Sequence, residues 1–90
     1  MKPADLPGGD LVATGLDDLR RGLESIPALL VSIGAPRLRR LGYAVPGPID
    51  DPERRLYALL ARDGPAGAHS RYNALIRRLV SFERAAECVR

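Results

Sequence analysis

Residues 69–88, HSRYNALIRRLVSFERAAEC, contain the longest amphipathic pattern of the chain. On a helix with 3.6 residues per turn, its apolar side chains fall within an arc of about 80°: Tyr72, Leu75, Leu79, Phe82 and Ala86. The arginines and Ser81 occupy the opposite half. The segment therefore predicts a long helix with one buried face. The end near Phe82 is also a candidate for contact with a partner across a dimer axis.

Shorter helical segments precede this one, and glycines and prolines separate them. We expect helices at about 11–21, 26–33, 37–41 and 52–62. The start signals are N-cap residues and a first-turn proline: Asp10, Ser25, Asp51 and Pro52. Residues 64–68 contain two glycines and a proline and predict a loop. The fold class is therefore all-α: a single small bundle of four to five short helices with a longer amphipathic C-terminal helix.

The length of 90 residues predicts one domain, with residues 1–9 as a flexible N-terminal arm and residues 10–90 as the helical domain. A domain of this size buries only a modest share of its surface, which favours association with itself or with a partner. The single cysteine cannot form an internal disulfide, and the longest apolar stretch is far shorter than the roughly 20 residues of a membrane span. We therefore expect a cytoplasmic protein without membrane contact.

Charge is unevenly distributed along the chain. Residues 1–34 carry three basic and five acidic side chains, whereas residues 35–90 carry eleven arginines against six acidic side chains. A basic half can bind an acidic protein surface or nucleic acid. The arginines form two clusters, one a candidate for nucleic acid and the other for a partner: Arg37, Arg39 and Arg40, and then Arg71, Arg77, Arg78 and Arg84.

The first arginine cluster follows a helix–glycine–helix pattern that faintly suggests a helix-turn-helix. Its second helix would have only about six residues, which is short for reading a groove. It also contains no asparagine or glutamine, the side chains that read adenine. Binding of RNA or DNA through these arginines is therefore an alternative to protein binding.

Enzymatic interpretations depend on His69, the only histidine of the chain. Arg62 and Asp63 are followed by five residues, His69 and then Tyr72, and this segment resembles the arginine–polar–histidine signature of HEPN-type ribonucleases. Those proteins are all-helical dimers, and many act as toxins. The resemblance implies metal-independent RNA cleavage by Arg62 and His69, with Tyr72 as a modification site. It covers about a tenth of the chain, and the predicted loop before His69 departs from the family pattern.

Other catalytic arrangements find no support in the sequence. Cys88 is expected on the same helix as His69, about 28 Å away, so the two side chains cannot form a dyad within one chain. No residue spacing indicates a metal site or a cofactor. We therefore expect a cytoplasmic helical protein–protein interaction module, either a homodimer or the small subunit of a two-component bacterial system with an operon-encoded partner. A nucleic-acid-binding module and the HEPN-like ribonuclease are the alternatives.

Overall fold

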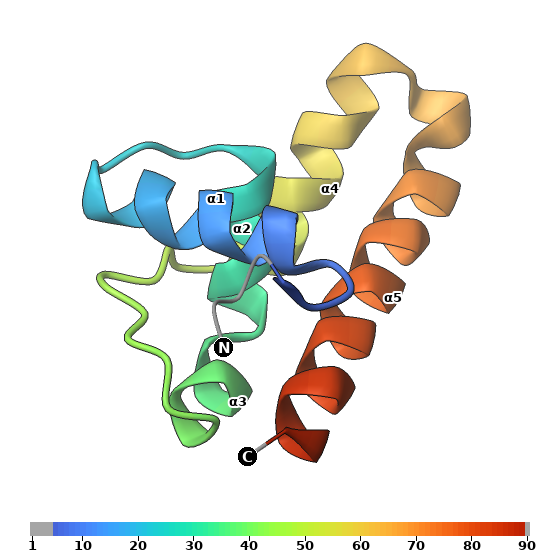
Figure 1. The fold of residues 1–90 in the computed structure, drawn as a ribbon. Helices are drawn as coiled ribbons and strands as arrows, with labels where there is room; N and C mark the ends of the chain where they lie inside the picture. The colour runs from blue at the N-terminus through green and yellow to red at the C-terminus, as the bar shows by residue number, and fades with distance from the viewer. Residues whose placement is uncertain (1–4, 90) are drawn as a thin grey trace.

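The computed structural model describes residues 5–89, which form five helices and no strand. The helices are α1 (Gly9–Arg20), α2 (Ile26–Ile33), α3 (Ala35–Arg40), α4 (Pro52–Asp63) and α5 (Pro65–Cys88) (Figure 1). The predicted all-α bundle with a longer C-terminal helix is confirmed. Residues 1–4 of the predicted arm lie outside the described residues, and Leu6 from the rest of that segment packs against the core.

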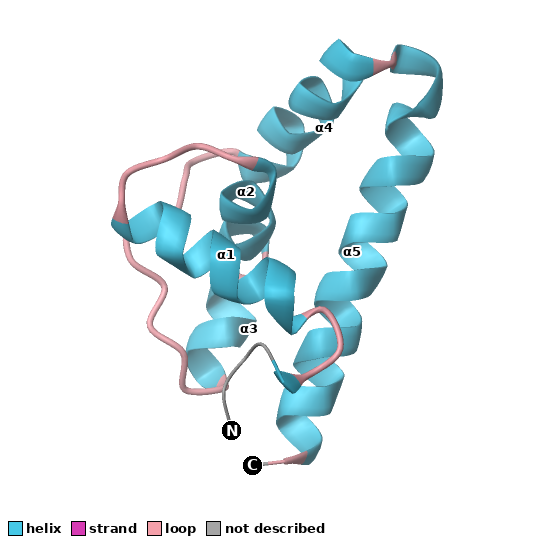
Figure 2. Cartoon of the chain, turned by 45° about the horizontal axis from the view of Figure 1, so that its top comes forward, coloured by secondary structure: helices cyan, strands magenta, loops and turns pink. Residues whose placement is uncertain are grey.

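The predicted loop at residues 64–68 is wrong, because α5 begins at Pro65 and only Gly64 separates it from α4. A proline is tolerated in the first turn of a helix, where its missing N–H would have no intrahelical partner. The turn is fastened by Arg71, whose Nη2 donates a hydrogen bond of 2.6 Å to the Leu60 carbonyl near the end of α4. The two helices form an antiparallel hairpin, which projects beyond the other helices (Figure 2).

The core surrounds α2, in which Ala28, Leu29, Leu30 and Val31 have no exposed surface. α1 packs against one side of α2 and α4 against another. α5 runs along one long side of the molecule, and α1, α2 and α3 all lie on the same side of α5 (Figures 1 and 2). The largest buried side chain is Phe82 of α5, and its ring lies 5.5 Å from that of Tyr43 in the connector after α3.

Two of the three predicted N-cap side chains do not cap their helices. Ser25 caps α2 as expected, since its Oγ accepts a hydrogen bond of 3.1 Å from the Ala28 N–H. Asp10 does not cap α1, because that helix begins at Gly9, two residues before the predicted start, with Gly8 at the N-cap position. Asp51 stands at the N-cap position of α4, but its carboxylate binds Arg54 at 2.6 Å instead of a backbone N–H.

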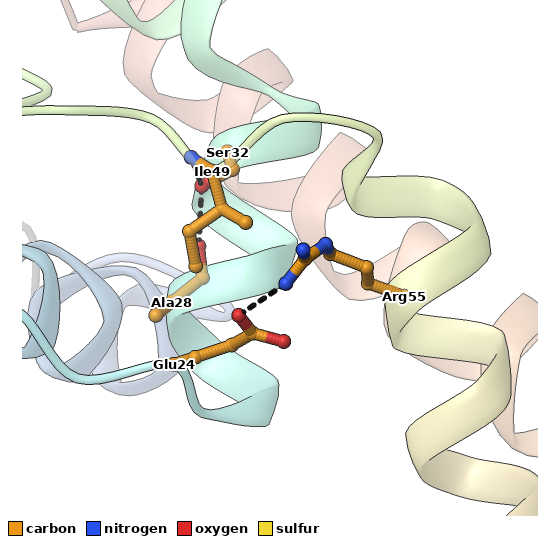
Figure 3. A network of polar contacts seen from close by, with 5 residues as sticks. All are labelled: Glu24, Ala28, Ser32, Ile49 and Arg55. Atoms are coloured by element: carbon orange, nitrogen blue, oxygen red, sulfur yellow. Dashed lines mark hydrogen bonds and ion pairs between the residues drawn. The ribbon is translucent and has the colours of Figure 1, made fainter.

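Polar contacts tie the long connector and α4 to α2 (Figure 3). Ser32 Oγ donates to the Ala28 carbonyl at 2.8 Å and accepts from the Ile49 N–H at 3.0 Å. Arg55 Nη1 of α4 meets Glu24 Oε1, just before α2, at 2.6 Å. The connector therefore has a fixed path, although it contains no regular secondary structure.

Gly15 permits the close crossing of α1 and α2. A methyl group at this position would collide with the Pro27 carbonyl and would come within 2.8 Å of the Val31 side chain. Gly67, in the first turn of α5, has open space around it. Gly15 therefore has a role in packing, whereas Gly67 makes no tertiary contact.

We expect Gly15→Ala to lower the free energy of unfolding by about 2 kcal/mol, because the added methyl group forces α1 and α2 apart. Gly67→Ala is the matched control and should raise it by about 0.5–1 kcal/mol through helix propensity alone. Urea unfolding followed by circular dichroism measures both. A Gly15→Ala protein as stable as the parent would contradict the close crossing.

Candidate functional site

The strongest candidate site is an open groove along one side of α5, which we call the α5 groove. Its volume is about 340 Å³, and α2, α4 and α5 supply its lining: Ile26, Leu60, Arg71, Ala74, Leu75 and Arg78. Ile26 and Leu75 are half-buried and Ala74 is exposed. The floor is therefore apolar, and two arginines flank it.

Both arginines of the α5 groove are held by contacts within the protein. Arg71 donates to the Leu60 carbonyl, a neutral acceptor, so its positive charge stays uncompensated by this bond. Arg78 Nη2 lies 3.0 Å from Asp10 Oδ1 of α1, in an exposed ion pair of the kind that contributes little to stability. The two arginines are seven residues apart, about 10 Å along the helix axis. A ligand in the groove would meet apolar carbon between two oriented guanidinium groups.

The predicted nucleic-acid cluster on α3 is largely engaged within the protein. Arg37 lies 2.9 Å from Glu87 Oε2 and 3.5 Å from Glu83 Oε1, both on α5. Arg39 Nη2 donates to the Val45 carbonyl at 2.9 Å. Arg40 is exposed but also has interactions. These residues join α3 to α5 and to the connector.

Glu83 is a buried carboxylate at the junction of α3 and α5, where its side chain is only 6% exposed. Burial raises its pKa, and Glu87 adds to this effect, whereas Arg37 and Arg40 lower the pKa. Gly34 leaves room for the carboxylate, because a methyl group there would approach Glu83 Oε2 to 3.1 Å. Desolvation outweighs the attraction of the arginines, so ionised Glu83 is held at a net cost.

The three residues of the ribonuclease-like signature have separate surroundings. Arg62 lines a hollow beside α2 together with Glu24, Arg55, Ala58 and Leu59. His69 is exposed in the second turn of α5, and its Nε2 lies 3.2 Å from Asn73 Nδ2. Tyr72 packs its ring 5.8 Å from that of Tyr57 across the hairpin, and burial raises its pKa.

The predicted partner contact through Phe82 is wrong for this fold. Its side chain is fully buried between α5 and the rest of the core, so no surface remains for a partner. Arg77 and Arg84 are exposed on the side of α5 away from the core. Within residues 5–89, neither of these arginines has a partner group.

No known protein family, curated protein or solved structure matches this chain. Between residues 5 and 89, no group of three or more histidine, cysteine or acidic side chains is arranged to hold a metal ion. In the same range, no helix combines the length and the apolar character needed to cross a membrane.

Sequence reasoning missed the apolar floor of the α5 groove, including Ile26, Leu60 and Ala74. The amphipathic pattern assigned Ile26 and Leu60 to the core, as it must for apolar residues on a helix face. Leu60 is buried as predicted, whereas Ile26 keeps part of its surface exposed because of how α2, α4 and α5 meet, which no local pattern contains. The only local indication of the groove in the sequence was the pair Arg71 and Arg78, two helical turns apart, with Ala74 between them.

The raised pKa of Glu83 predicts how stability changes with pH. The folded protein binds this proton more tightly than the unfolded chain, so the contribution of Glu83 is greatest below the ordinary pKa and declines as pH rises through the folded pKa. Compared with Glu83→Gln, the parent should therefore lose relative stability over the pH range above the ordinary pKa of glutamate. Urea unfolding of both proteins across this range measures the difference. If the parent instead gains stability relative to Glu83→Gln as pH rises, the attraction of the arginines outweighs desolvation.

Proposed function

We propose that this protein is a protein–protein interaction module that binds an amphipathic helix of a partner protein in the α5 groove. One observation carries the proposal: an open apolar groove lies at the edge of the core and is flanked by two arginines that the protein's own contacts orient. Helix-binding grooves commonly combine an apolar floor with charged rims that set orientation.

The arginines specify the chemistry of the partner. An incoming helix would place apolar side chains against Ile26 and Leu75 and carboxylates near Arg71 and Arg78. Guanidinium groups bind carboxylates in a bidentate geometry, which adds directional specificity to apolar contact. The partner segment is therefore an amphipathic helix with acidic residues about two turns apart.

A different protein fits the α5 groove better than a second copy does. A two-fold contact through the groove would bring Arg71 and Arg78 of both copies together, and like charges in an interface oppose association. The large exposed apolar side chains of residues 5–89 are Leu23, Tyr57 and Val89, on different elements, so they form no stripe that could enter the groove. Of the two partners expected from the sequence, we favour the operon-encoded protein over the homodimer.

We place this module in the cytoplasm. Cys88 is exposed at the end of α5, and an exposed free thiol persists in a reducing compartment. The small subunit of a two-component system would meet its partner there.

Ala74→Arg tests the proposal, because the larger side chain would fill the groove. Ala66→Arg is the matched control on the same helix. Both alanines are exposed, but only Ala74 lines the groove. The products of the adjacent genes are purified one by one, and their affinities are measured by isothermal titration calorimetry. We expect one of them to bind, Ala74→Arg to weaken this binding at least about tenfold, and Ala66→Arg to leave it unchanged.

Several outcomes would contradict the proposal. Binding that survives Ala74→Arg would place the interface elsewhere, and the absence of binding by any adjacent product would remove the operon-encoded partner. Light scattering that shows a stable dimer, abolished only by Ala74→Arg, would replace the acidic partner with a second copy. Both variants should unfold within about 0.5 kcal/mol of the parent, because the substitutions are on the surface.

A further inference from the structure

The outward side of α5 has a composition unlike that of the rest of the surface. Within an arc of about 120° on one side of α5, polar side chains recur on four successive turns, and we call five of them the polar face: His69, Asn73, Arg77, Ser81 and Arg84. Ser70 and the half-buried Val80 lie within the same arc, and Glu87 follows in it near the end of the helix. Four of them are exposed, and Asn73 is half-buried. The polar face does not include the residues that line the α5 groove.

The five residues of the polar face include two arginines and no acidic residue, and the one carboxylate that follows in the same arc is Glu87. From Gly64 to Phe82 the chain has no aspartate or glutamate, Glu83 is buried, and Glu87 is paired with Arg37 at 2.9 Å. Asp10, which contacts α5 from α1, is paired with Arg78 at 3.0 Å. Within the described residues 5–89, Arg77 and Arg84 have no such partner. The face therefore presents uncompensated positive charge, which is complementary to a polyanion.

The polar face contains side-chain types that read bases. Asparagine pairs with the N6 and N7 atoms of adenine, arginine with the O6 and N7 atoms of guanine, and serine with either type of base. Asn73 and Arg77 are one turn apart, and Ser81 follows one turn later. This combination is absent from α3, where the sequence pattern first suggested nucleic-acid contact.

The dimensions of α5 fit the major groove of B-form DNA. Its 24 residues span about 36 Å, comparable to the 38 Å longest extent of the whole molecule. Asn73 and Arg84 are about 16 Å apart along the axis, the rise of about five base pairs. α5 borders the molecule along one side (Figure 1), and four of the five polar-face side chains are exposed. The major groove of A-form RNA is too narrow for a helix, so duplex DNA is the better match.

We propose that the polar face of α5 binds duplex DNA in the major groove, with Arg77 and Arg84 on phosphates and Asn73 at a base edge. This site is independent of the partner groove. Substitutions at Ala74 test the groove, and substitutions at Arg77 and Arg84 test the polar face, so the failure of one proposal leaves the other intact.

The experiment measures fluorescence anisotropy with a labelled 20-base-pair DNA duplex of mixed sequence, from about 50 mM to about 200 mM salt. We expect binding whose affinity falls steeply with salt. Arg77→Ala/Arg84→Ala should weaken binding at least about tenfold at the lowest salt and should reduce the slope of log K against log salt by about 1.8.

The matched control is Arg20→Ala/Arg54→Ala. It removes the same amount of charge from exposed arginines on α1 and α4, whose partners are Asp17 and Asp51. We expect this control to weaken binding by less than about threefold and to keep the slope. Arg77→Gln/Arg84→Gln keeps much of each side chain and should behave like the alanine variant, which separates loss of charge from loss of packing.

Asn73→Ala tests base reading. It should keep the salt slope of the parent but should relax the preference for an adenine position in duplexes selected from a random pool. The proposal is overturned if no DNA binds at about 50 mM salt, or if the control variant loses as much affinity as Arg77→Ala/Arg84→Ala. An RNA duplex of the same sequence that binds as tightly as DNA would overturn it as well.

Discussion

A short helix without a single charged side chain dictates the arrangement of this protein. The sequence of α2 is IPALLVSI, and residues 28–32 within it are buried. A helix that is apolar on all sides must be covered on all sides. α1, α4 and α5 each cover part of it, and the connector closes over Ser32. The surrounding helices each bury one face and leave another free, so most of the surface available for function lies on them, and α2 contributes only Ile26 to the α5 groove.

Three sides of the long helix α5 have three different environments. Its inner side holds Phe82 and Leu79 in the core, one flank borders the α5 groove, and the outer side carries the polar face. The ion pair of Glu83 with Arg37 fixes the C-terminal half of α5 against α3, whereas Arg71 fixes the N-terminal half against α4. Because α5 is fastened near both ends, the groove and the polar face keep a constant orientation relative to each other.

The sequence was sufficient for the elements that depend on periodicity and local start signals. The spacing of apolar residues located all five helices, and Ser25 identified the start of α2, because these features depend on near neighbours along the chain. The beginning of α5 was misplaced because Pro65 and Gly67 are typical of loops, although neither is excluded from a first helical turn.

Long-range relationships could not be predicted. Asp10 and Arg78 are 68 residues apart, and only the packing of α1 against α5 brings them together. Glu83 lies next to Phe82 in the sequence and at the edge of the apolar arc, but its burial depends on the space beside Gly34. The geometry of the candidate site belongs to this class, because the rims of the α5 groove come from one helix and its floor comes from three.

The single-residue link at Gly64 couples the rotation of α5 to that of α4. Each residue added to or removed from a helix turns everything beyond it by about 100°. A length change in this hairpin would have to be absorbed within the turn, where Arg71 already bridges to Leu60. Otherwise the length change would rotate the buried side of α5 out of the core, and the groove and the outer arginines would rotate with it. The hairpin thus sets the rotation of α5 about its own axis: substitutions on its outer surface leave this rotation unchanged, but a change in the number of residues between the two helices does not.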